Sequence, residues 1–261
     1  MMKLSHWYGR LGNNIQQCAI GTICARNNRT TFESIDHEII FPHKTSFGNS
    51  DASQVSKFFY YEGPYKEVDL EPSQVYEEMR EICRDFVRPH LDVPRVVIPD
   101  DTIVIHIRSG DVFDTGVSNP DQYVPNPLDF YRQLLGSYDR ALVVTEPDNY
   151  NPVVQELKRY DKVTVQSLTV QEDFATMLAA KNLASSGVGT FAISAALCSK
   201  NIENFYCSNV RISEHLNWKM LLDTDVKVHL MELHNYLQPG EWKNTDEQRQ
   251  FILSYRNLQP A

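Results

Sequence analysis

The sequence lacks any long hydrophobic run, and this absence sets the first limits on function. No stretch approaches the roughly 18 consecutive apolar residues that span a bilayer, and the N-terminal residues MMKLSHWYGRLGNN contain no apolar core of a signal peptide. We therefore expect a cytoplasmic protein without an integral membrane segment.

Cysteine and histidine do not occur in metal-binding patterns. The 5 cysteines are odd in number and scattered, which favours reduced core residues over a disulfide framework or a zinc site. The 8 histidines show no His-x-x-x-His spacing, so no protein-bound metal is predicted. Asp223-Thr224-Asp225 has a form that holds divalent cations in some enzymes, but it follows the regular part of the chain and is better interpreted as a solvated turn.

Basic residues are fewer than acidic residues in this sequence. With 25 Lys and Arg against 34 Asp and Glu, the formal net charge is -9, which argues against non-specific binding to nucleic acid or anionic membranes. A local basic pocket for a single small anion is still compatible with this balance. The 261 residues are 42% apolar and 23% charged, as in an ordinary soluble globular protein of one large or two modest domains.

The second half of the chain alternates strands and helices. Strands are predicted at 102–106, 141–145, 163–168, 183–185 and 204–207, and helices at 127–137, 152–160, 170–181 and 191–199. Repeated β and α units with short connections imply a doubly wound parallel sheet. A helix that starts at Pro72 and a proline-marked connector from Asp92 to Asp101 precede it, so we place a domain boundary there. A further helix is predicted at 246–255.

The first half is less regular. A short strand predicted from Leu4 to Tyr8 leads into the glycine turn Gly9-Arg10-Leu11-Gly12-Asn13-Asn14 and then into a helix with apolar residues at helical spacing. Such a turn can present backbone N–H groups to an anion or sugar, although packing and capping are the commoner use. Further strands are predicted at 31–35, 38–41 and 57–61, and the aromatic residues at 58–65 favour a core with a tyrosine rim over a sugar-stacking surface.

The stretch TIVIHIRSGD, residues 102–111, joins a buried strand to a polar cluster. Ligands of open α/β sheets collect outside the carboxyl ends of strands, where His106, Arg108 and Asp111 stand. Arg108 offers a rigid fork of donors suited to a diphosphate, and Gly110 permits a turn that a side chain would block. The alternative is an Arg–Asp pair that only ties a loop to the strand end.

The pattern His-x-Arg-x-Gly-Asp at 106–111 resembles the signature of the fucosyltransferase superfamily that includes the α1,2-, α1,6- and protein O-fucosyltransferases. The glycine turn at 9–14 is similar to a segment that lines the cleft in that family. A third stretch, 173–196, resembles the family's Asp in a helix followed by a Ser or Thr before Phe. It departs from the family because Val188-Gly189-Thr190-Phe191 replaces the common Ser-Ser-Phe-Ser. On physical grounds this glycine turn is either an anion site or a turn chosen for close packing.

The resemblance implies a two-domain, Rossmann-like α/β fold of the glycosyltransferase B type. Residues 1–95 would form an acceptor-side α/β domain, 96–210 the nucleotide-sugar-binding domain, and 211–261 a C-terminal tail that packs across the two halves. The implied reaction is inverting, metal-independent transfer of L-fucose from GDP-fucose to a hydroxyl of a glycan acceptor. No cofactor beyond this donor substrate is implied.

The resemblance also implies roles for particular residues. Arg108 is the expected catalytic residue, because it would grip the diphosphate of the donor, and Arg10 is a cleft residue. The expected donor-binding residues are Gly12, Asn13, His106, Arg108, Asp173, Thr190 and Phe191, with Gly110 and Asp111 structural at the site. A general base for the acceptor hydroxyl is not singled out among Asp36, Glu38 and Glu62.

Other functions stay open at this point. The same fold could use another nucleotide sugar, such as a UDP-pentose, because the motif departs from the family around Gly189. A non-catalytic glycan-binding module would bind the acceptor without turnover. A nicotinamide-dependent oxidoreductase would need Gly-x-Gly-x-x-Gly after the first strand, and the spacing of Gly9 and Gly12 does not supply it.

Overall fold

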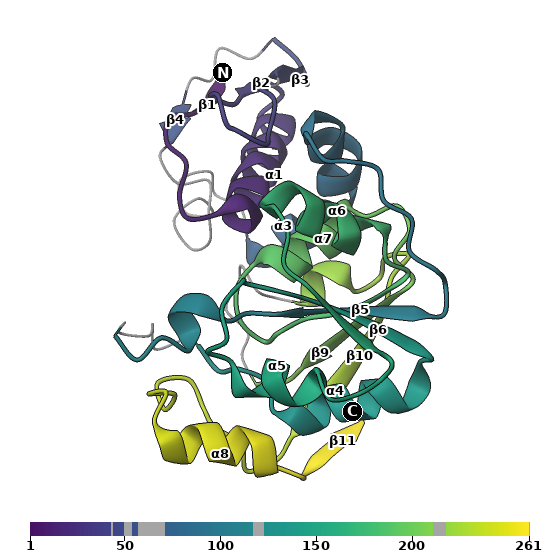
Figure 1. The fold of residues 1–261 in the computed structure, drawn as a ribbon. Coiled ribbons are helices and arrows are strands. Elements are labelled where there is room, and N and C mark those ends of the chain that lie inside the picture. The colour runs from purple at the N-terminus through teal and green to yellow at the C-terminus, as the bar shows by residue number, and fades with distance from the viewer. Residues whose placement is uncertain (43, 50–53, 57–70, 117–122, 211–217, 261) are drawn as a thin grey trace.

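A computed structural model describes residues 1–42, 44–49, 54–56, 71–116, 123–210 and 218–260. Two sheets organise this part of the chain, with helices between them and below the larger one (Figure 1). The predicted strand at 57–61, the aromatic residues at 58–65 and the candidate base Glu62 lie outside the described residues.

The smaller sheet is built from the first half, in the order β3-β2-β1-β4. Its strands are β1 (Met2–Leu4), β2 (Thr31–Glu33), β3 (Lys44–Ser46) and β4 (Gln54–Ser56). β1 is parallel to β2 and β4, and α1 (Leu11–Asn27) makes the crossover from β1 to β2. The first strand therefore ends earlier than predicted, and Ser5 to Arg10 form a loop that leads into the helix.

The strand predicted at 38–41 is absent and reduces to one bridge between Ile40 and Leu91. The His37 side chain explains this difference, because its Nδ1 accepts hydrogen bonds from the backbone N–H groups of Ile39 and Ile40. Local side-chain acceptors of this kind compete with a sheet ladder for the same donors.

The larger sheet has the order β11-β10-β9-β8-β5-β6-β7. Its parallel strands are β5 (Thr102–Ile107), β6 (Arg140–Thr145), β7 (Val163–Gln166), β8 (Asn182–Ala184), β9 (Asn204–Ser208) and β10 (Lys227–Leu233), and β11 (Leu258–Pro260) is antiparallel. The helices are α4 (Leu128–Ser137), α5 (Pro152–Leu157), α6 (Val170–Ala179), α7 (Phe191–Cys198) and α8 (Asp246–Ser254). The helices and the strands β5 to β9 agree with the predicted elements to within a few residues, whereas β10 and β11 were not predicted.

The strand order contains a reversal between β5 and β8. From β5 the chain adds β6 and β7 on one side, and then returns to add β8, β9 and β10 on the other. In open α/β sheets ligands bind outside the carboxyl ends of the strands at such a reversal. The predicted α/β class with a Rossmann-like parallel sheet is confirmed, while the B-type division into domains at 95 and 210 stays a prediction.

Helices cover both faces of the larger sheet. In Figure 1, α1, α6, α7 and α3 (Pro72–Ile82) lie on the face turned toward the smaller sheet, and α4, α5 and α8 lie on the opposite face. The first group shares one apolar core with β1 and β2, and the second group packs a separate core around Phe130 and Trp242. A continuous core therefore joins the first half of the chain to the second half.

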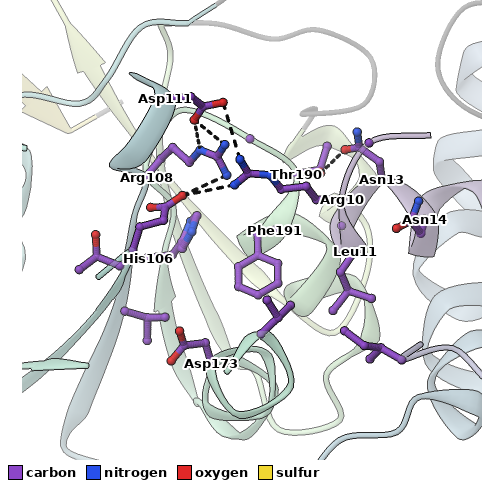
Figure 2. A pocket seen from close by; sticks show the side chains of 18 of the residues that line it. Arg10, Leu11, Asn13, Asn14, His106, Arg108, Asp111, Asp173, Thr190 and Phe191 are labelled. Atoms are coloured by element: carbon purple, nitrogen blue, oxygen red, sulfur yellow. Dashed lines mark hydrogen bonds and ion pairs between the residues drawn. The ribbon is translucent and has the colours of Figure 1, made fainter. Parts of the chain in front are cut away.

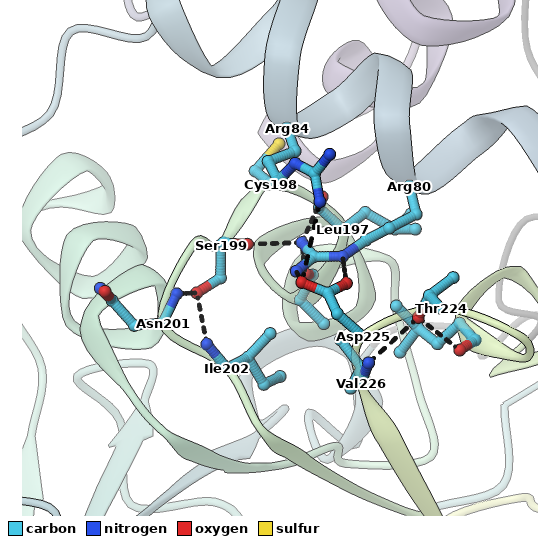
Figure 3. Close-up of polar contacts among 12 residues, drawn as sticks. Arg80, Arg84, Leu197, Cys198, Ser199, Asn201, Ile202, Thr224, Asp225 and Val226 are labelled. Carbon is cyan, nitrogen blue, oxygen red and sulfur yellow. Dashed lines mark hydrogen bonds and ion pairs between the residues drawn. The ribbon is translucent and has the colours of Figure 1, made fainter.

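Arg80 of α3 fastens the first half to the C-terminal end of α7 (Figure 3). Its guanidinium, only 3% exposed, donates to the backbone oxygens of Ala196, Leu197 and Ser199 at 2.8, 2.9 and 2.5 Å. These carbonyls are among those that a helix end leaves unpaired, and a cation there also complements the helix dipole. Arg80 Nε also lies 3.1 Å from a carboxylate oxygen of Asp225.

Asp225 belongs to the Asp-x-Asp motif, and the motif forms a turn. The Thr224 hydroxyl donates to Leu221 O and accepts from the backbone N–H of Val226 (Figure 3). The Asp225 carboxylate faces Arg80 and Arg84, so it is ion-paired rather than only solvated. Among the described residues, no group of three or more His, Cys, Asp or Glu side chains is placed so that it could hold a metal ion.

The described part of the tail, from residue 218, completes the larger sheet. The short helix η5 (Trp218–Leu221) contacts α3, while β10 and β11 extend the sheet and α8 packs against α4 and α5. Over the described residues, no helix has both the length and the apolar character to cross a bilayer.

Candidate functional site

A cavity of about 570 Å³ opens at the strand reversal, between the two halves (Figure 2). Its walls come from the ends of β5, β6 and β7, from the first turn of α6, and from the turn before α7. The first half contributes residues 9–14 and 37–39.

The structure brings the predicted donor-binding residues together. Gly12, Asn13, His106, Arg108, Asp173, Thr190 and Phe191 all line the cavity, as do Arg10 and Asp111. Gly110 does not line it, but has a φ of +46° in the turn that follows Arg108. These residues come from three separate stretches of the chain, and what each of them does to a ligand stays a prediction.

Arg108 is held between two carboxylates. Its Nε lies 3.1 Å from Asp111 Oδ1, and its Nη1 lies 3.1 Å from Glu146 Oε1 (Figure 2). Arg10, on the first half, reaches the same two carboxylates at 3.9 and 3.7 Å. The two arginines thus present a guanidinium pair to the cavity, with their charge balanced by two carboxylates that a bound anion could partly replace.

Glu146 was not predicted from the sequence. It follows β6 directly, and β6 is the parallel neighbour of β5, so its carboxylate meets Arg108 at the same edge of the sheet. Its other oxygen accepts the backbone N–H of Ser109 at 2.7 Å. An acidic residue directly after the strand next to the signature was the available signal.

The loops after β5 and β6 are tied together by two further residues that the sequence did not reveal. Asp148 accepts from the hydroxyl of Ser109 and from the backbone N–H of Gly110. The Asn151 side chain donates to Arg108 O at 3.0 Å. The backbone that carries Arg108 is thereby fixed from the neighbouring loop.

The starts of α1 and α7 meet at the opposite side of the cavity. The Ser194 hydroxyl donates to Gly12 O at 2.9 Å, and a Cβ on Gly12 would lie only 2.6 Å from Thr190 Oγ1 and 2.8 Å from its carbonyl carbon. Glycine is therefore required for this close approach. Thr190 is the N-cap of α7 but makes no side-chain capping bond, which leaves the first N–H groups of the helix without that partner.

His106 is a neutral side chain in the wall beneath Arg108. It is 4% exposed, and its ring packs edge-on against Phe191 at 5.4 Å. Burial, together with the neighbouring Arg108 charge, lowers the pKa of His106 to about 3. Its Nδ1 is buried without a hydrogen-bond partner in the described part of the chain.

Asp173 projects from the first turn of α6. Its carboxylate accepts from Gln166 Nε2 at 2.8 Å and from the backbone N–H of Leu168 at 3.2 Å. Burial raises the pKa of Asp173, and these two donors oppose that rise. A carboxylate has about four acceptor positions, so capacity is left for donors of a ligand.

The first-half wall separates two of the three candidate bases, Asp36 and Glu38, while Glu62 lies outside the described residues. Glu38 lines the cavity, whereas Asp36 is exposed on the same segment and is not part of the lining. His37, between them, is occupied: its Nδ1 accepts two backbone N–H groups, and its Nε2 faces Asn14 Oδ1 at 3.1 Å. This arrangement fixes the backbone on which Glu38 stands.

Comparison with known proteins yields little. No family model matches the chain, and a search of curated proteins finds no match. A search of solved structures finds a crystal structure of POFUT1 in complex with GDP, with 11% identity and a TM-score of 0.40 over 78% of this chain and 97% of that chain. A likeness at this level leaves the function to be inferred from the residues of the cavity.

Proposed function

We propose that this protein is a glycosyltransferase that transfers L-fucose from GDP-fucose to a hydroxyl of a glycan, with inversion and without a metal. The observation that carries the proposal is the position of Arg108: it stands at the carboxyl end of β5, at the strand reversal, in one cavity with the start of α7. The resemblance of residues 106–111 to the fucosyltransferase signature supports the same assignment.

Arg108 and the start of α7 would act on the diphosphate. Departure of GDP places negative charge on the β-phosphate, and preorganised donors aimed at that charge lower the barrier. Arg108 supplies a fork of charged N–H donors, and the first N–H groups of α7 supply neutral ones. Together these donors would do the work that a divalent cation does in other glycosyltransferases.

Asp173 would select guanine as the base of the donor nucleotide. Guanine presents two adjacent donors, N1–H and the N2 amino group, which match the two oxygens of a carboxylate. The exposed apolar side chains of Leu168 and Val170 border the same end of the cavity and offer a surface for the base. Uracil has one such donor, so a carboxylate at this position favours GDP over UDP.

Glu38 would serve as the general base for the acceptor hydroxyl. Four carboxylates line the cavity, and three are engaged: Asp111 and Glu146 by arginines, and Asp173 by Gln166 and Leu168. No hydrogen bond or ion pair among the described residues engages Glu38, which leaves its carboxylate available to take a proton.

Thermal stabilisation by nucleotides tests the proposal. GDP, UDP, ADP and CMP would each be added without metal to the wild type, to Arg108→Ala and to the control Arg159→Ala, whose exposed side chain pairs with Glu156 of α5. Saturating GDP should stabilise the wild type and the control by about 2 to 4 kcal/mol and the Arg108 variant much less.

The other outcomes separate the alternatives. Stabilisation by UDP alone would keep a glycosyltransferase but replace the donor. No stabilisation by any nucleotide would overturn the proposal in favour of a glycan-binding module. GDP stabilisation that survives in Arg108→Ala would remove Arg108 from its assigned role.

A further inference from the structure

Arg249 of α8 binds both loops that carry the carboxylates flanking Arg108. Its Nη1 donates to Tyr150 O at 3.1 Å, in the loop after β6, and its Nη2 donates to Phe113 O, in the loop after β5. Its Nε donates to Asn244 Oδ1 at 2.9 Å, which fixes the plane of the guanidinium. A single side chain of the C-terminal tail thus bridges two loops from the middle of the chain.

The loop after β5 is clamped by a second tail residue. Trp242, 2% exposed, donates from its indole N–H to Val112 O at 3.1 Å, and its ring lies edge-on to Phe113 at 5.3 Å. The guanidinium carbon of Arg249 lies over the Phe113 ring, 5.9 Å from its centroid. Phe113 is therefore held through both its ring and its carbonyl.

These clamps lie close to the donors and acceptors of the cavity. Phe113 follows the short helical turn Gly110–Val112, which carries Asp111, and Tyr150 ends the loop that begins at Glu146. Asp111 and Glu146 are the two carboxylates that orient Arg108. A shift of either loop would change the direction in which the Arg108 fork points.

We propose that Arg249 is a positioning residue for donor binding, which acts through Arg108. By holding Phe113 O and Tyr150 O at a fixed separation, it keeps Asp111 and Glu146 in the places that aim Arg108 at the diphosphate. This inference rests on the proposed function, because it takes the diphosphate of the donor as the group that Arg108 binds. Misplacement by about 1 Å at a site of this kind can cost roughly 100-fold in rate.

The test compares Arg249→Met with Arg256→Met in the full chain. Methionine keeps an unbranched side chain over Phe113 but removes the N–H donors. Arg256 is a matched control, since it lies in the same tail and its guanidinium donates to the backbone oxygens of Leu253 and Tyr255, also in the tail, at 3.0 and 2.6 Å. Calorimetric titration with GDP and with guanosine gives the affinity with and without the diphosphate.

Arg249→Met should weaken GDP binding by about 10-fold to 100-fold, change guanosine binding less than about twofold, and leave Arg256→Met like the wild type. In an Arg108→Lys background the effect of Arg249→Met on GDP should largely vanish, because the two residues act in one chain of contacts. A purely structural role would weaken guanosine and GDP alike and would persist in that background.

Each contrary result has a distinct meaning. Equal loss of GDP and guanosine, or unchanged GDP affinity in a folded Arg249→Met, overturns the positioning role while the proposed function stands. A wild type that binds no GDP overturns the proposed function itself. If Arg249→Met fails to fold, Arg249→Lys, which keeps the charge but loses the fork, provides the same comparison.

Discussion

The Thr190 hydroxyl donates a hydrogen bond to the Asn13 side-chain oxygen, although the two residues lie 177 positions apart in the chain. This contact joins the first turn of α1 to the N-cap of α7 at the wall of the cavity. The two halves of the chain therefore touch directly at the side of the cavity where the proposed function places the diphosphate. Substitutions in either half that disturb this contact should change both the affinity for GDP and the free energy of unfolding.

Gly12→Ala should destabilise the protein and weaken GDP binding. The added Cβ would meet the backbone of Thr190 and Phe191 at 2.8 and 2.9 Å, and backbone cannot move aside as a flexible side chain can. We expect a loss of about 1 to 3 kcal/mol in the free energy of unfolding, measured by urea denaturation.

Gly136→Ala is the matched control for that substitution. Gly136 lies within α4, and a Cβ there would meet nothing within 4 Å. Alanine should stabilise this helix by about 0.5 to 1 kcal/mol. If Gly12→Ala is as stable as the wild type, the close approach of α1 and α7 does not depend on glycine.

Glu146→Gln should lower the affinity for GDP. The two carboxylate oxygens now face Arg108 Nη1 and the backbone N–H of Ser109, and glutamine would replace one of these acceptors with an NH2 group that faces a donor. Loss of a charged hydrogen bond of about 1.5 to 3 kcal/mol would allow Arg108 to turn away, and we expect roughly tenfold weaker binding by calorimetry.

Glu156→Gln controls for the loss of one negative charge near Arg side chains. Glu156 pairs with Arg159 on the exposed surface of α5, so its replacement should leave GDP affinity unchanged. Tighter GDP binding in Glu146→Gln would mean that Glu146 competes with the diphosphate for Arg108 rather than orienting it.

Acid should destabilise the wild type more than a His106→Gln variant. The pKa of His106 is about 3 in the folded chain and near its ordinary value of 6.5 when unfolded. Between these values the unfolded state binds a proton that the folded state does not, so folded stability falls as the pH falls through this window, by up to about 1.4 kcal/mol per pH unit.

Denaturation at a series of pH values measures this difference. Other histidines with lowered pKa values, His37, His90 and His229, occur in both proteins and cancel in the comparison. The difference in the free energy of unfolding between the wild type and the variant should narrow from pH 6 to pH 4. Parallel curves would show that folding does not lower the pKa of His106.

The cavity could be predicted from the sequence only where its residues form local patterns. The strand at 102–107 and the polar turn after it are contiguous, so the apolar run and the position of Arg108 and Gly110 sufficed. Glu146 and Arg249 do not belong to a local sequence motif. Their contacts depend on the order of the strands in the sheet and on how the C-terminal tail packs, and neither of these produces a periodic pattern in the sequence.

The first half was harder for a related physical reason. Its strands are three residues long in β1, β2 and β3, too short to show alternation, and β3 was not predicted at all. The segment around Glu38 takes its shape from hydrogen bonds to the His37 ring rather than from a ladder. The sequence alone therefore does not indicate whether Asp36 or Glu38 faces the cavity.

Glu38→Gln should suppress turnover and spare donor binding. A general base contributes about 100-fold to 10,000-fold, so release of GDP from GDP-fucose, with water as acceptor, should fall by at least the lower figure while GDP affinity stays the same. Asp36→Asn, two residues away and outside the cavity lining, should behave as the wild type. Equal rates in Glu38→Gln and Asp36→Asn would remove Glu38 as the base, because Glu38 lines the cavity and Asp36 does not.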